Sequence, residues 1–162
     1  MNNKFLVFDM DGTIADLYGT ADWRHRLDVS DASVYTDAAP MIDMSVFTAC
    51  LDTLRAMGYK VAILTWLSKN ADPVFHENIR KAKSEWIKRY GIPADDVIML
   101  DYGTDKSDAF CKRHPGSDAM LFDDDAKVRA SWCGRVIDPV QYDINTVLGG
   151  LIRYNMNYNT EV

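Results

Sequence analysis

Phe5-Leu-Val-Phe-Asp-Met-Asp-Gly-Thr-Ile14 is the stretch from which both the fold and the chemistry of this chain can be predicted. Its four leading residues are apolar without interruption, which is typical of a strand buried on both faces of a parallel sheet. Two carboxylates, Asp9 and Asp11, follow at the place where open α/β sheets bind their ligands. Gly12 allows a tight turn there. The stretch predicts a ligand site, with a polar turn that merely ends the strand as the alternative.

Composition predicts one ordinary globular domain that spans residues 1–162. Of the 162 residues, 48% are hydrophobic and 26% are charged, as in soluble proteins generally. We find no apolar run long enough to span a membrane and no secretion signal. Cys50, Cys111 and Cys133 lack the spacing of a metal site and indicate reduced thiols, so we expect a cytoplasmic protein. A net charge of −6 argues against a general nucleic-acid binder but leaves room for a local basic patch.

Four further apolar runs are expected to form strands after the first one, which covers residues 4–9. They lie at 59–65, 97–101, 119–122 and 135–138. Between them we expect a helix that Pro40 opens and Gly58 ends, a second helix at 73–90, and a short helix that reaches Arg113. A last helix is expected after the final strand, at 144–156. The alternation predicts an α/β fold, in which a parallel sheet of about five strands carries helices on both faces.

Residues 15–40, between the first strand and the first long helix, show no sustained hydrophobic period. A long irregular segment in a compact domain usually has a function or carries small elements of its own. We interpret this insert as a flap, or minimal cap, over the crevice, with Trp23 and Arg24 as candidate substrate-binding residues and His25 as a weaker one. The alternative is that its aromatic residues seal one edge of the core.

Polar side chains follow several of the predicted strands, and the carboxyl ends of parallel strands meet at one edge of a sheet. Four carboxylates in one crevice repel one another unless a cation lies among them. Oxygen ligands without His or Cys favour a hard ion, and one that also shares a phosphate is Mg²⁺. The side chains expected to converge are Asp9, Asp11, Thr65, Lys106, Asp123 and Asp124.

The same set of side chains suits a phosphoryl substrate. The Thr65 hydroxyl and the Lys106 ammonium can bind phosphoryl oxygens. Asp9 can attack phosphorus, because the metal and Lys106 offset the repulsion between two anions. Asp11 can protonate the leaving oxygen and later accept a proton from water. The pattern therefore predicts phosphoryl transfer that depends on Mg²⁺.

Four short motifs in this order resemble those of haloacid dehalogenase-like phosphatases. They are Asp9-Met-Asp-Gly-Thr13, Thr65, Lys106 and Asp123-Asp124, and the match runs from residue 4 to about residue 138. The resemblance implies a Rossmann-like sheet, a phospho-aspartate intermediate and Mg²⁺. It also implies that Asp9 is the nucleophile and that Asp11 is the acid/base, whose backbone carbonyl binds the metal as well.

The resemblance implies roles for the later motifs too. Thr65 is then the phosphate-binding hydroxyl, and Lys106 stabilises charge. Asp124 is the direct metal ligand, with Asp123 beside it, although Asp125 lengthens the acidic run and leaves this assignment open by one residue. The further substrate-binding candidates are Gly12, Thr13 and Trp66.

Each motif also has a simpler interpretation. Thr65 could merely end its strand, and the acidic run could cap a helix N-terminus. Lys106 is preferred over Lys81 and Lys83 as the lysine of the third motif, because it stands just before a short helix. The basic side chains of the helix at 73–90, Lys83 among them, are expected on a solvated outer face, with nucleic-acid contact as the alternative.

The insert and two local similarities bear on the substrate. An insert of about 25 residues makes a small cap, so we expect a crevice that is open to large substrates or completed by a partner subunit. Residues 9–17 with Thr104-Asp-Lys-Ser are similar to 5′(3′)-deoxyribonucleotidases, and residues 70–73 and 86–93 are similar to the phosphatase domain of polynucleotide kinases. We therefore expect a nucleotide or a nucleic-acid-end phosphate as the substrate.

Other functions stay open on sequence alone. One is a phosphatase of a sugar phosphate or another small metabolite, and a second is a phosphotransferase of the same family. A third is a non-catalytic binding module, which the complete set of motifs does not favour. The sequence does not predict an oligomeric state.

Overall fold

Five parallel strands form the central sheet of the computed structural model, which describes residues 3–158. They are β1 (Lys4–Phe8), β4 (Tyr59–Trp66), β5 (Asp96–Leu100), β6 (Asp118–Phe122) and β7 (Arg135–Ile137), in the spatial order β5-β4-β1-β6-β7. The strand that begins the chain lies in the centre, with Phe8 opposite Ile63 on one side and Phe122 on the other. The predicted α/β fold with a Rossmann-like parallel sheet is confirmed, and the strands fall close to their expected places.

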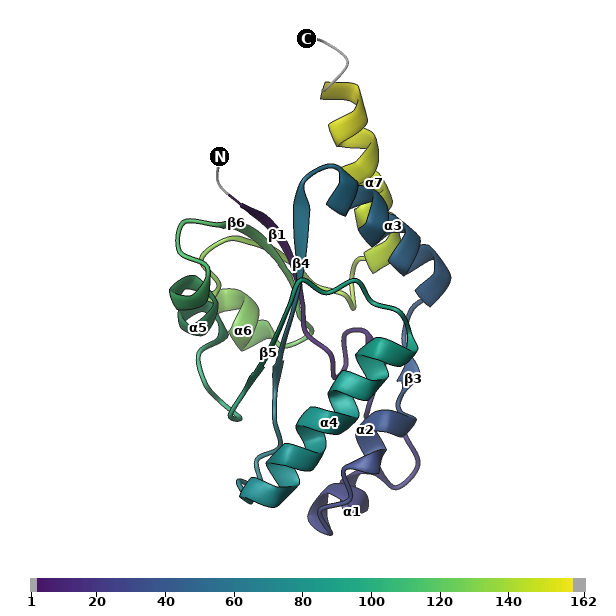
Figure 1. The fold of residues 1–162 in the computed structure, drawn as a ribbon, viewed down its shortest axis with the longest axis vertical. Helices are drawn as coiled ribbons and strands as arrows, with labels where there is room; N and C mark the ends of the chain where they lie inside the picture. The colour runs from purple at the N-terminus through teal and green to yellow at the C-terminus, as the bar shows by residue number, and fades with distance from the viewer. Residues whose placement is uncertain (1–2, 159–162) are drawn as a thin grey trace.

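Helices cover both faces of the sheet (Figure 1). One face carries α3 (Met44–Ala56), α4 (Pro73–Arg89) and α7 (Ile144–Tyr158), and the other carries α5 (Lys106–Arg113) and α6 (Ala126–Ser131). The residues of β1 alternate between the two cores: Leu6 and Phe8 pack under α3 and α7, whereas Phe5 and Val7 pack under α5 and α6. Each of these four side chains is at most 2% exposed. Burial on both faces explains why the first strand is an unbroken apolar run.

Five helices within residues 3–158 begin with an aspartate cap, including α7, where Asp143 accepts from the Thr146 N–H. The side chains of Asp43, Asp72, Asp105 and Asp125 each accept a hydrogen bond from a backbone N–H in the first turn of α3, α4, α5 and α6. An aspartate in this position satisfies a donor that has no partner within the helix. The prediction that Pro40 opens the first long helix is wrong, because Asp43 supplies the cap and the helix begins at Met44.

Pro40 instead belongs to the insert, which has regular structure of its own. A two-stranded antiparallel ladder, β2 (Ala15–Asp16) with β3 (Ala39–Pro40), closes its base. Between these strands lie α1 (Trp23–Asp28) and α2 (Ser33–Asp37), and Figure 1 shows α2 beside α4, with α1 below α2. Tyr35 of α2 is 4% exposed and packs in a cluster with Ile79 and Ala82 of α4. Part of the insert therefore belongs to the core, and part does not.

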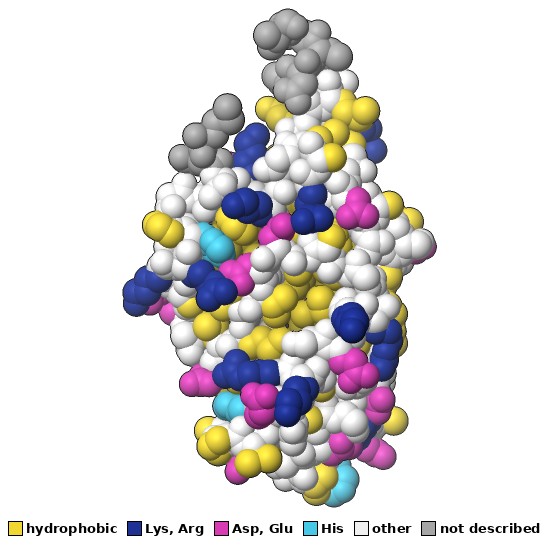
Figure 2. Space-filling model, viewed as in Figure 1, with side chains coloured by type: hydrophobic (Ala, Val, Ile, Leu, Met, Phe, Trp, Pro, Cys, Tyr) yellow, Lys and Arg dark blue, Asp and Glu magenta, His cyan; other side chains and the backbone are white. Residues whose placement is uncertain are grey.

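The surface carries charged side chains of both signs. Figure 2 shows acidic and basic side chains intermixed on one face, around apolar surface near the middle of the view. Within residues 3–158, no helix has the length and apolar character needed to cross a membrane. Cys50, Cys111 and Cys133 are free thiols.

Candidate active site

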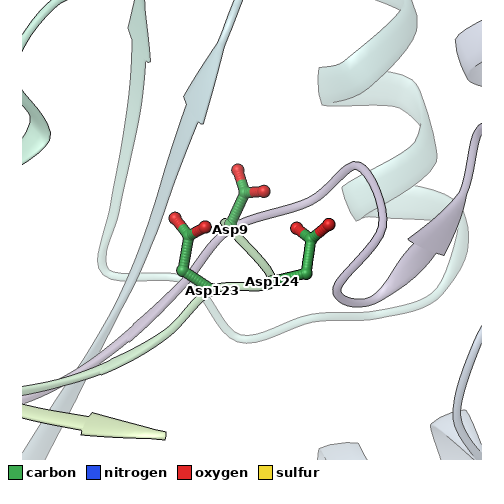
Figure 3. Close-up of side chains that lie close together, drawn as sticks. All are labelled: Asp9, Asp123 and Asp124. Atoms are coloured by element: carbon green, nitrogen blue, oxygen red, sulfur yellow. The ribbon is translucent and has the colours of Figure 1, made fainter. Parts of the chain in front are cut away.

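Three carboxylates meet at the carboxyl ends of β1 and β6. Asp9 directly follows β1, and Asp123 and Asp124 directly follow β6. The two strands are neighbours, and the Asp9 N–H donates to the Phe122 carbonyl at 2.9 Å. One oxygen from each of the three carboxylates lies within 4.8 Å of the others, and Figure 3 shows the side chains gathered at this point. The sequence prediction of a convergent acidic cluster thus agrees with the geometry.

The chemistry of these three side chains fits a hard divalent cation. Asp9 and Asp123 are buried, and Asp124 is half-buried. Burial, together with repulsion from Asp9, raises the pKa of Asp123 to about 6, and Lys106 opposes the rise. Burial and Asp9 also raise the pKa of Asp124. A cation held by carboxylate oxygens would relieve this repulsion, and oxygen ligands of this kind suit Mg²⁺.

Lys106 lies beside this cluster and is 2% exposed. Its Nζ is 2.9 Å from Asp9 Oδ1 and 2.7 Å from Asp123 Oδ2. Burial disfavours a charged lysine, but the two carboxylates outweigh it and raise the pKa of Lys106. Because Asp105 caps α5 and Lys106 is the first residue of that helix, the helix start holds the ammonium against the nucleophile candidate. Lys106 therefore occupies the place that the third motif predicts.

Gly12 and Thr13 lie against Asp124 and do not line the cavity described below. The Thr13 hydroxyl lies 3.2 Å from Asp124 Oδ1 and accepts from the Asp124 N–H at 3.2 Å. Gly12 has a φ of +81°, and a Cβ there would lie 2.6 Å from Asp124 Oδ2. Their backbone N–H groups donate to Ala15 and Met10 carbonyls. Both residues hold the acidic loop in place, while a substrate contact for either stays a prediction.

Asp125 contributes to the helix and not to the acidic cluster. Its carboxylate accepts from the backbone N–H groups of Lys127 and Val128 and so caps α6. Its own N–H donates to Asp123 Oδ1 at 2.9 Å. Of the three consecutive aspartates, Asp123 and Asp124 are those in the cluster. The capping interpretation of the acidic run thus applies to its last residue.

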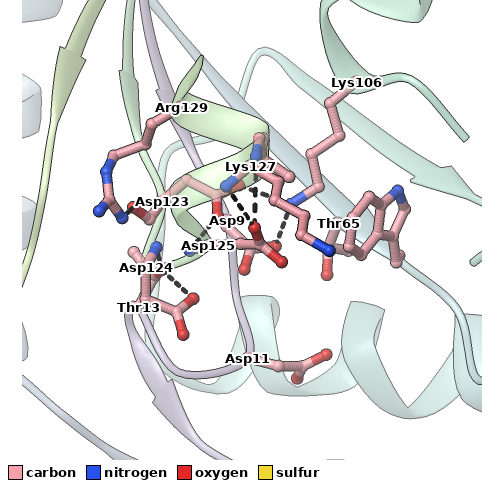
Figure 4. A network of polar contacts seen from close by, with 12 residues as sticks. Asp9, Asp11, Thr13, Thr65, Lys106, Asp123, Asp124, Asp125, Lys127 and Arg129 are labelled. Carbon is pink, nitrogen blue, oxygen red and sulfur yellow. Dashed lines mark hydrogen bonds and ion pairs between the residues drawn. The ribbon is translucent and has the colours of Figure 1, made fainter. Parts of the chain in front are cut away.

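Asp11 points away from Asp124, as Figure 4 shows, and its carboxylate is not one of the cluster oxygens. Its Oδ2 instead accepts from Lys83 Nζ at 2.6 Å. Burial raises the pKa of Asp11, and the charge of Lys83 opposes the rise. A raised pKa favours the protonated form that a general acid needs. The metal contact expected of the Asp11 backbone carbonyl stays a prediction.

Lys83 is the residue whose place the sequence prediction got wrong. It was expected on the solvated outer face of α4, yet its side chain is fully buried. Lys83 stands four residues after Ile79 and three before Trp86, both of which are fully buried. Helical periodicity therefore places Lys83 on the buried stripe, and this spacing is the signal that could have revealed it.

Thr65 connects Lys83 to the remaining motifs. Its side chain is fully buried, and its Oγ1 accepts from Lys83 Nζ at 2.8 Å. It stands near the end of β4 and lines the same cavity as Asp9 and Asp11. All four predicted motifs thus meet at one edge of the sheet (Figure 4).

A cavity of about 590 Å³ opens above these residues. Within the usual range for small-molecule sites, roughly 300–1,000 Å³, this volume suits a ligand of nucleotide size. Two aromatic pairs contribute to its walls, with ring centres 5.2 Å apart for Tyr18 and Trp23 and 5.1 Å apart for Trp66 and Tyr102. The cavity thus has a polar floor and partly aromatic walls.

Each aromatic wall carries a cation. Arg24 lies 5.2 Å from the ring centre of Trp23, and Lys69 lies 4.8 Å from that of Tyr102. Both cations line the cavity. Trp23, Arg24 and Trp66 were predicted from the sequence as substrate-binding candidates, whereas Lys69 and Tyr102 were not. No local pattern marks these two, because they reach the cavity only through the loops after β4 and β5.

Comparison with known proteins supports the fold. No family model matches the chain, and no curated protein matches it. A structure of the Pnkp1/Rnl/Hen1 complex covers 84% of this chain at 20% identity with a TM-score of 0.61. A structure of the Pnkp1/Rnl/Hen1 RNA repair complex also covers 84% of this chain at 20% identity, and its TM-score is 0.59. The chain spans 45% and 42% of those two chains, less than half of their length.

A haloacid dehalogenase-like hydrolase from Burkholderia xenovorans LB400 is 16% identical and covers 84% of this chain and 80% of its own. Its TM-score is 0.46, which is too low to support an inference. The two complex structures therefore carry the comparison, and they confirm the fold that the sequence motifs predicted. Identity of 20% bears on the fold and leaves the activity to be argued from the site.

Proposed function

We propose that this protein is a Mg²⁺-dependent phosphomonoesterase that acts through a phospho-aspartate on Asp9. The observation that carries this proposal is the buried ammonium of Lys106, 2.9 Å from Asp9 within a cluster of three carboxylates at the floor of a cavity. A cation held by these carboxylates, together with the lysine ammonium, can offset the charge of a phosphate dianion. A carboxylate oxygen of Asp9 can then attack the phosphorus. Asp123 and Asp124 would hold the cation together with Asp9.

The proposed reaction has two steps. In the first, a carboxylate oxygen of Asp9 forms a bond to phosphorus, the bond from phosphorus to the ester oxygen breaks, and Asp11 gives its proton to that oxygen. In the second, Asp11 takes a proton from water, whose oxygen bonds to phosphorus while the bond between phosphorus and Asp9 breaks. Lys106 and the Thr65 hydroxyl stabilise phosphoryl charge in both steps. Bound Mg²⁺ supplies the positive charge that offsets repulsion between Asp9 and the phosphate.

A nucleotide or a nucleic-acid end is the proposed source of the phosphate. Aromatic faces such as those of Trp23 and Trp66 stack on bases, and Arg24 and Lys69 offer positive charge along the walls. One of the two similar structures comes from a complex described as an RNA repair complex, which is in keeping with this proposed substrate class. A sugar phosphate would not use the aromatic walls in this way. The free cysteines suit a cytoplasmic site of action.

A substrate panel tests this proposal. It contains nucleoside 3′- and 5′-monophosphates, 3′-phosphorylated oligonucleotides, sugar phosphates and p-nitrophenyl phosphate, each with Mg²⁺. We expect phosphate release from all esters of the first two classes, with kcat/KM at least about tenfold above that for sugar phosphates, given the energy of base stacking. A preference for sugar phosphates would contradict the substrate class, and no release from any ester would contradict the phosphatase.

A mass measurement tests the intermediate. After a rapid acid quench of enzyme mixed with substrate, we expect the intact protein to gain one phosphoryl group, and peptide mapping to place it on Asp9. Phosphate release with inversion of configuration at a chiral phosphorus would contradict the covalent mechanism, because direct attack of water is one displacement, whereas two displacements retain the configuration. Transfer of the group to an added alcohol in place of water would identify a phosphotransferase.

A further inference from the structure

We propose that Lys83 is a positioning residue that aims two groups of the active site: the carboxylate of Asp11 and the hydroxyl of Thr65. The proposal rests on the phosphatase function argued above. Lys83 comes from α4, outside the four motifs, and its side chain is fully buried. It differs from Lys106 in its partners, because Lys106 touches the candidate nucleophile and Lys83 touches the candidate acid/base.

The hydrogen bonds of Lys83 leave no donor for a substrate. Its Nζ lies 2.6 Å from Asp11 Oδ2, 2.8 Å from Thr65 Oγ1 and 2.8 Å from the Trp66 carbonyl. A lysine ammonium has three N–H donors, and these three acceptors use all of them. Lys83 therefore acts on a phosphoryl group through its two neighbours and not by direct contact.

The bond to Thr65 sets the direction in which that hydroxyl donates. A threonine hydroxyl has one hydrogen and can also accept. Since Lys83 donates to Oγ1, the hydrogen of Thr65 stays available for an oxygen of the substrate. Without Lys83, the same hydrogen could be given to the Trp66 carbonyl or to Asp11, which would then lack their donor.

The bond to Asp11 keeps that carboxylate separate from the acidic cluster. Asp11 stands two residues after Asp9, so a freely rotating side chain could turn toward the cation that the cluster is proposed to hold. The contact with Lys83 draws it to the α4 side of the cavity, as its direction in Figure 4 indicates. A general acid must lie within hydrogen-bond reach of the leaving oxygen, and one that binds the cation would be lost to this task.

The place of Lys83 is held from three sides. Burial of an unpaired ammonium would be costly, and here hydrogen bonds to three oxygen acceptors, from Asp11, Thr65 and Trp66, offset the loss of water. The ring centre of Tyr35, from the insert, lies 4.9 Å from Nζ. The indole of Trp86, one turn along α4, donates to the Ala38 carbonyl at 2.7 Å. Lys83 thus joins the insert, α4 and the loop after β1 at one point.

The test compares leaving groups that differ in their need for a proton. An alkoxide leaving from a nucleoside monophosphate needs protonation, whereas p-nitrophenolate is stable as an anion. We expect Lys83→Met to slow the first turnover of a nucleoside monophosphate by at least about tenfold, since general acid catalysis is worth about 10²–10⁴-fold. The first turnover of p-nitrophenyl phosphate does not need a proton from Asp11, so its loss should reflect Thr65 alone and be clearly smaller than that of the nucleoside monophosphate. First turnovers are used because later steps need Asp11 as a base for both esters.

A double-mutant comparison separates positioning from a merely structural role. If Lys83 acts on the leaving group through Asp11, Lys83→Met in an Asp11→Asn background should slow the nucleoside monophosphate only by the factor that it causes on p-nitrophenyl phosphate, which reflects Thr65 alone. Lys81→Met is the matched control, because Lys81 lies on the same helix with its side chain 71% exposed. Lys83→Gln is the second variant if the methionine variant does not fold, since it keeps donors and removes the charge.

The outcomes distinguish failure of the positioning role of Lys83 from failure of the proposed phosphatase function. Equal losses on both esters in Lys83→Met and Lys83→Gln, or full additivity with Asp11→Asn, would overturn the positioning role while wild-type phosphatase activity stands. If the wild-type protein hydrolyses neither ester with Mg²⁺, the proposed function fails before Lys83 is tested. A split between the two esters that disappears in the Asp11→Asn background would support the proposal.

Discussion

The floor and the walls of the cavity are built in different ways. On the floor, Lys106 and Asp123 are at most 2% exposed and are tied together by short ion pairs at the ends of β6 and α5. On the walls, Trp23 is half-buried and Arg24 is exposed. Trp23 contacts Arg24 and the Tyr18 ring, and it packs against the edge of the cluster that contains Tyr35. Ion pairs at the edge of the sheet thus hold the floor in place, whereas the walls are held by packing at the margin of a core cluster.

The two helices that carry these residues show the same difference. The helix α5 begins at Lys106 and has Asp105 as a side-chain cap. The wall helix α1 begins after Asp22, which has a φ of 54°, lacks a side-chain cap and buries none of its residues. Its Trp23 and Leu27 are partly buried against the cluster that contains Tyr35, and a short helix without a side-chain cap depends on such tertiary packing for its stability. Under the proposed function, the floor would carry the chemistry and the walls would select the substrate.

The largest expected effect comes from the floor. Asp9→Asn replaces the candidate nucleophile with a poor one of similar shape, so we expect kcat to fall by at least about a thousandfold. The fold should persist, because Lys106 keeps its ion pair with Asp123. Steady-state rates on a nucleoside monophosphate and thermal unfolding check the two statements. A near-normal rate would remove Asp9 from its proposed role.

Removal of the cation should act on the floor almost as strongly. In excess EDTA we expect phosphatase activity to disappear and to return with added Mg²⁺, because the carboxylate cluster otherwise repels the phosphate. Thermal unfolding supplies a second measurement: Mg²⁺ at a hundred times its Kd should stabilise the fold by about 2.7 kcal/mol, and Asp124→Asn should weaken this shift. Full activity in EDTA would contradict the metal site.

Lys106→Ala tests the cation that the chain itself supplies. We expect kcat on p-nitrophenyl phosphate to fall by about a hundredfold or more, as for removal of a charge-stabilising donor in other active sites. The loss should exceed that of Lys83→Ala on the same ester, since Lys106 is the lysine that touches Asp9. Lys112→Ala, on the exposed side of the same helix, is the control. The reverse order of the two lysines would reassign the third motif.

The walls are expected to give a smaller and more selective effect. Trp23→Ala and Arg24→Ala should each raise KM for nucleotides by about tenfold, a typical value for loss of base stacking. They should leave p-nitrophenyl phosphate hydrolysis unchanged, because that ester is too small to reach the walls. Val29→Ala, at the exposed end of α1, serves as the matched control. Equal losses on both esters with a lower Tm would instead place these residues in the core.

The smallest expected effect concerns the support of the walls. Arg26 pairs with Asp31 and Asp37 at 2.7 Å each, and exposed pairs are worth less than about 1 kcal/mol. Arg26→Ala should therefore lower the free energy of unfolding only slightly. Hydrogen bonds from Ser33 and Arg26 lower the pKa of Asp31, so their contribution is present above its unfolded pKa and is lost as the pH falls through its folded pKa. The difference in free energy of unfolding between wild type and variant, measured with urea, should become smaller in acid. A difference that does not change with pH would contradict a contribution from ionised Asp31.

Much of the floor could be predicted because parallel strands impose a simple geometry. The apolar run before Asp9 and the one before Asp123 each indicate a strand, and adjacent parallel strands bring their carboxyl ends together. Lys106 followed from its place before a short helix. These inferences need only the order of residues along the chain and the type of each element.

The insert and the helix α4 show where this reasoning stops. Lys83 looks like one more basic residue on a charged helix, and its spacing from Ile79 and Trp86 indicates the buried face without indicating which groups it meets there. The insert was expected as a flap or as an edge of the core, and the structure divides it: Tyr35 packs in the core, while Arg24 lines the cavity. The pattern of polar and apolar residues within the insert does not specify which of its side chains a neighbouring element will bury.

The sequence by itself therefore determined the sheet, the order of its motifs and the acidic cluster at its edge, since each depends on local periodicity and chain order. The tertiary structure alone decided that Lys83 joins Asp11 to Thr65, that Asp125 caps a helix, and that Gly12 and Thr13 support Asp124. The physical reason is that a hydrogen bond forms within about 3 Å, a precision that depends on how helices and loops pack against one another and not on the pattern within any one of them.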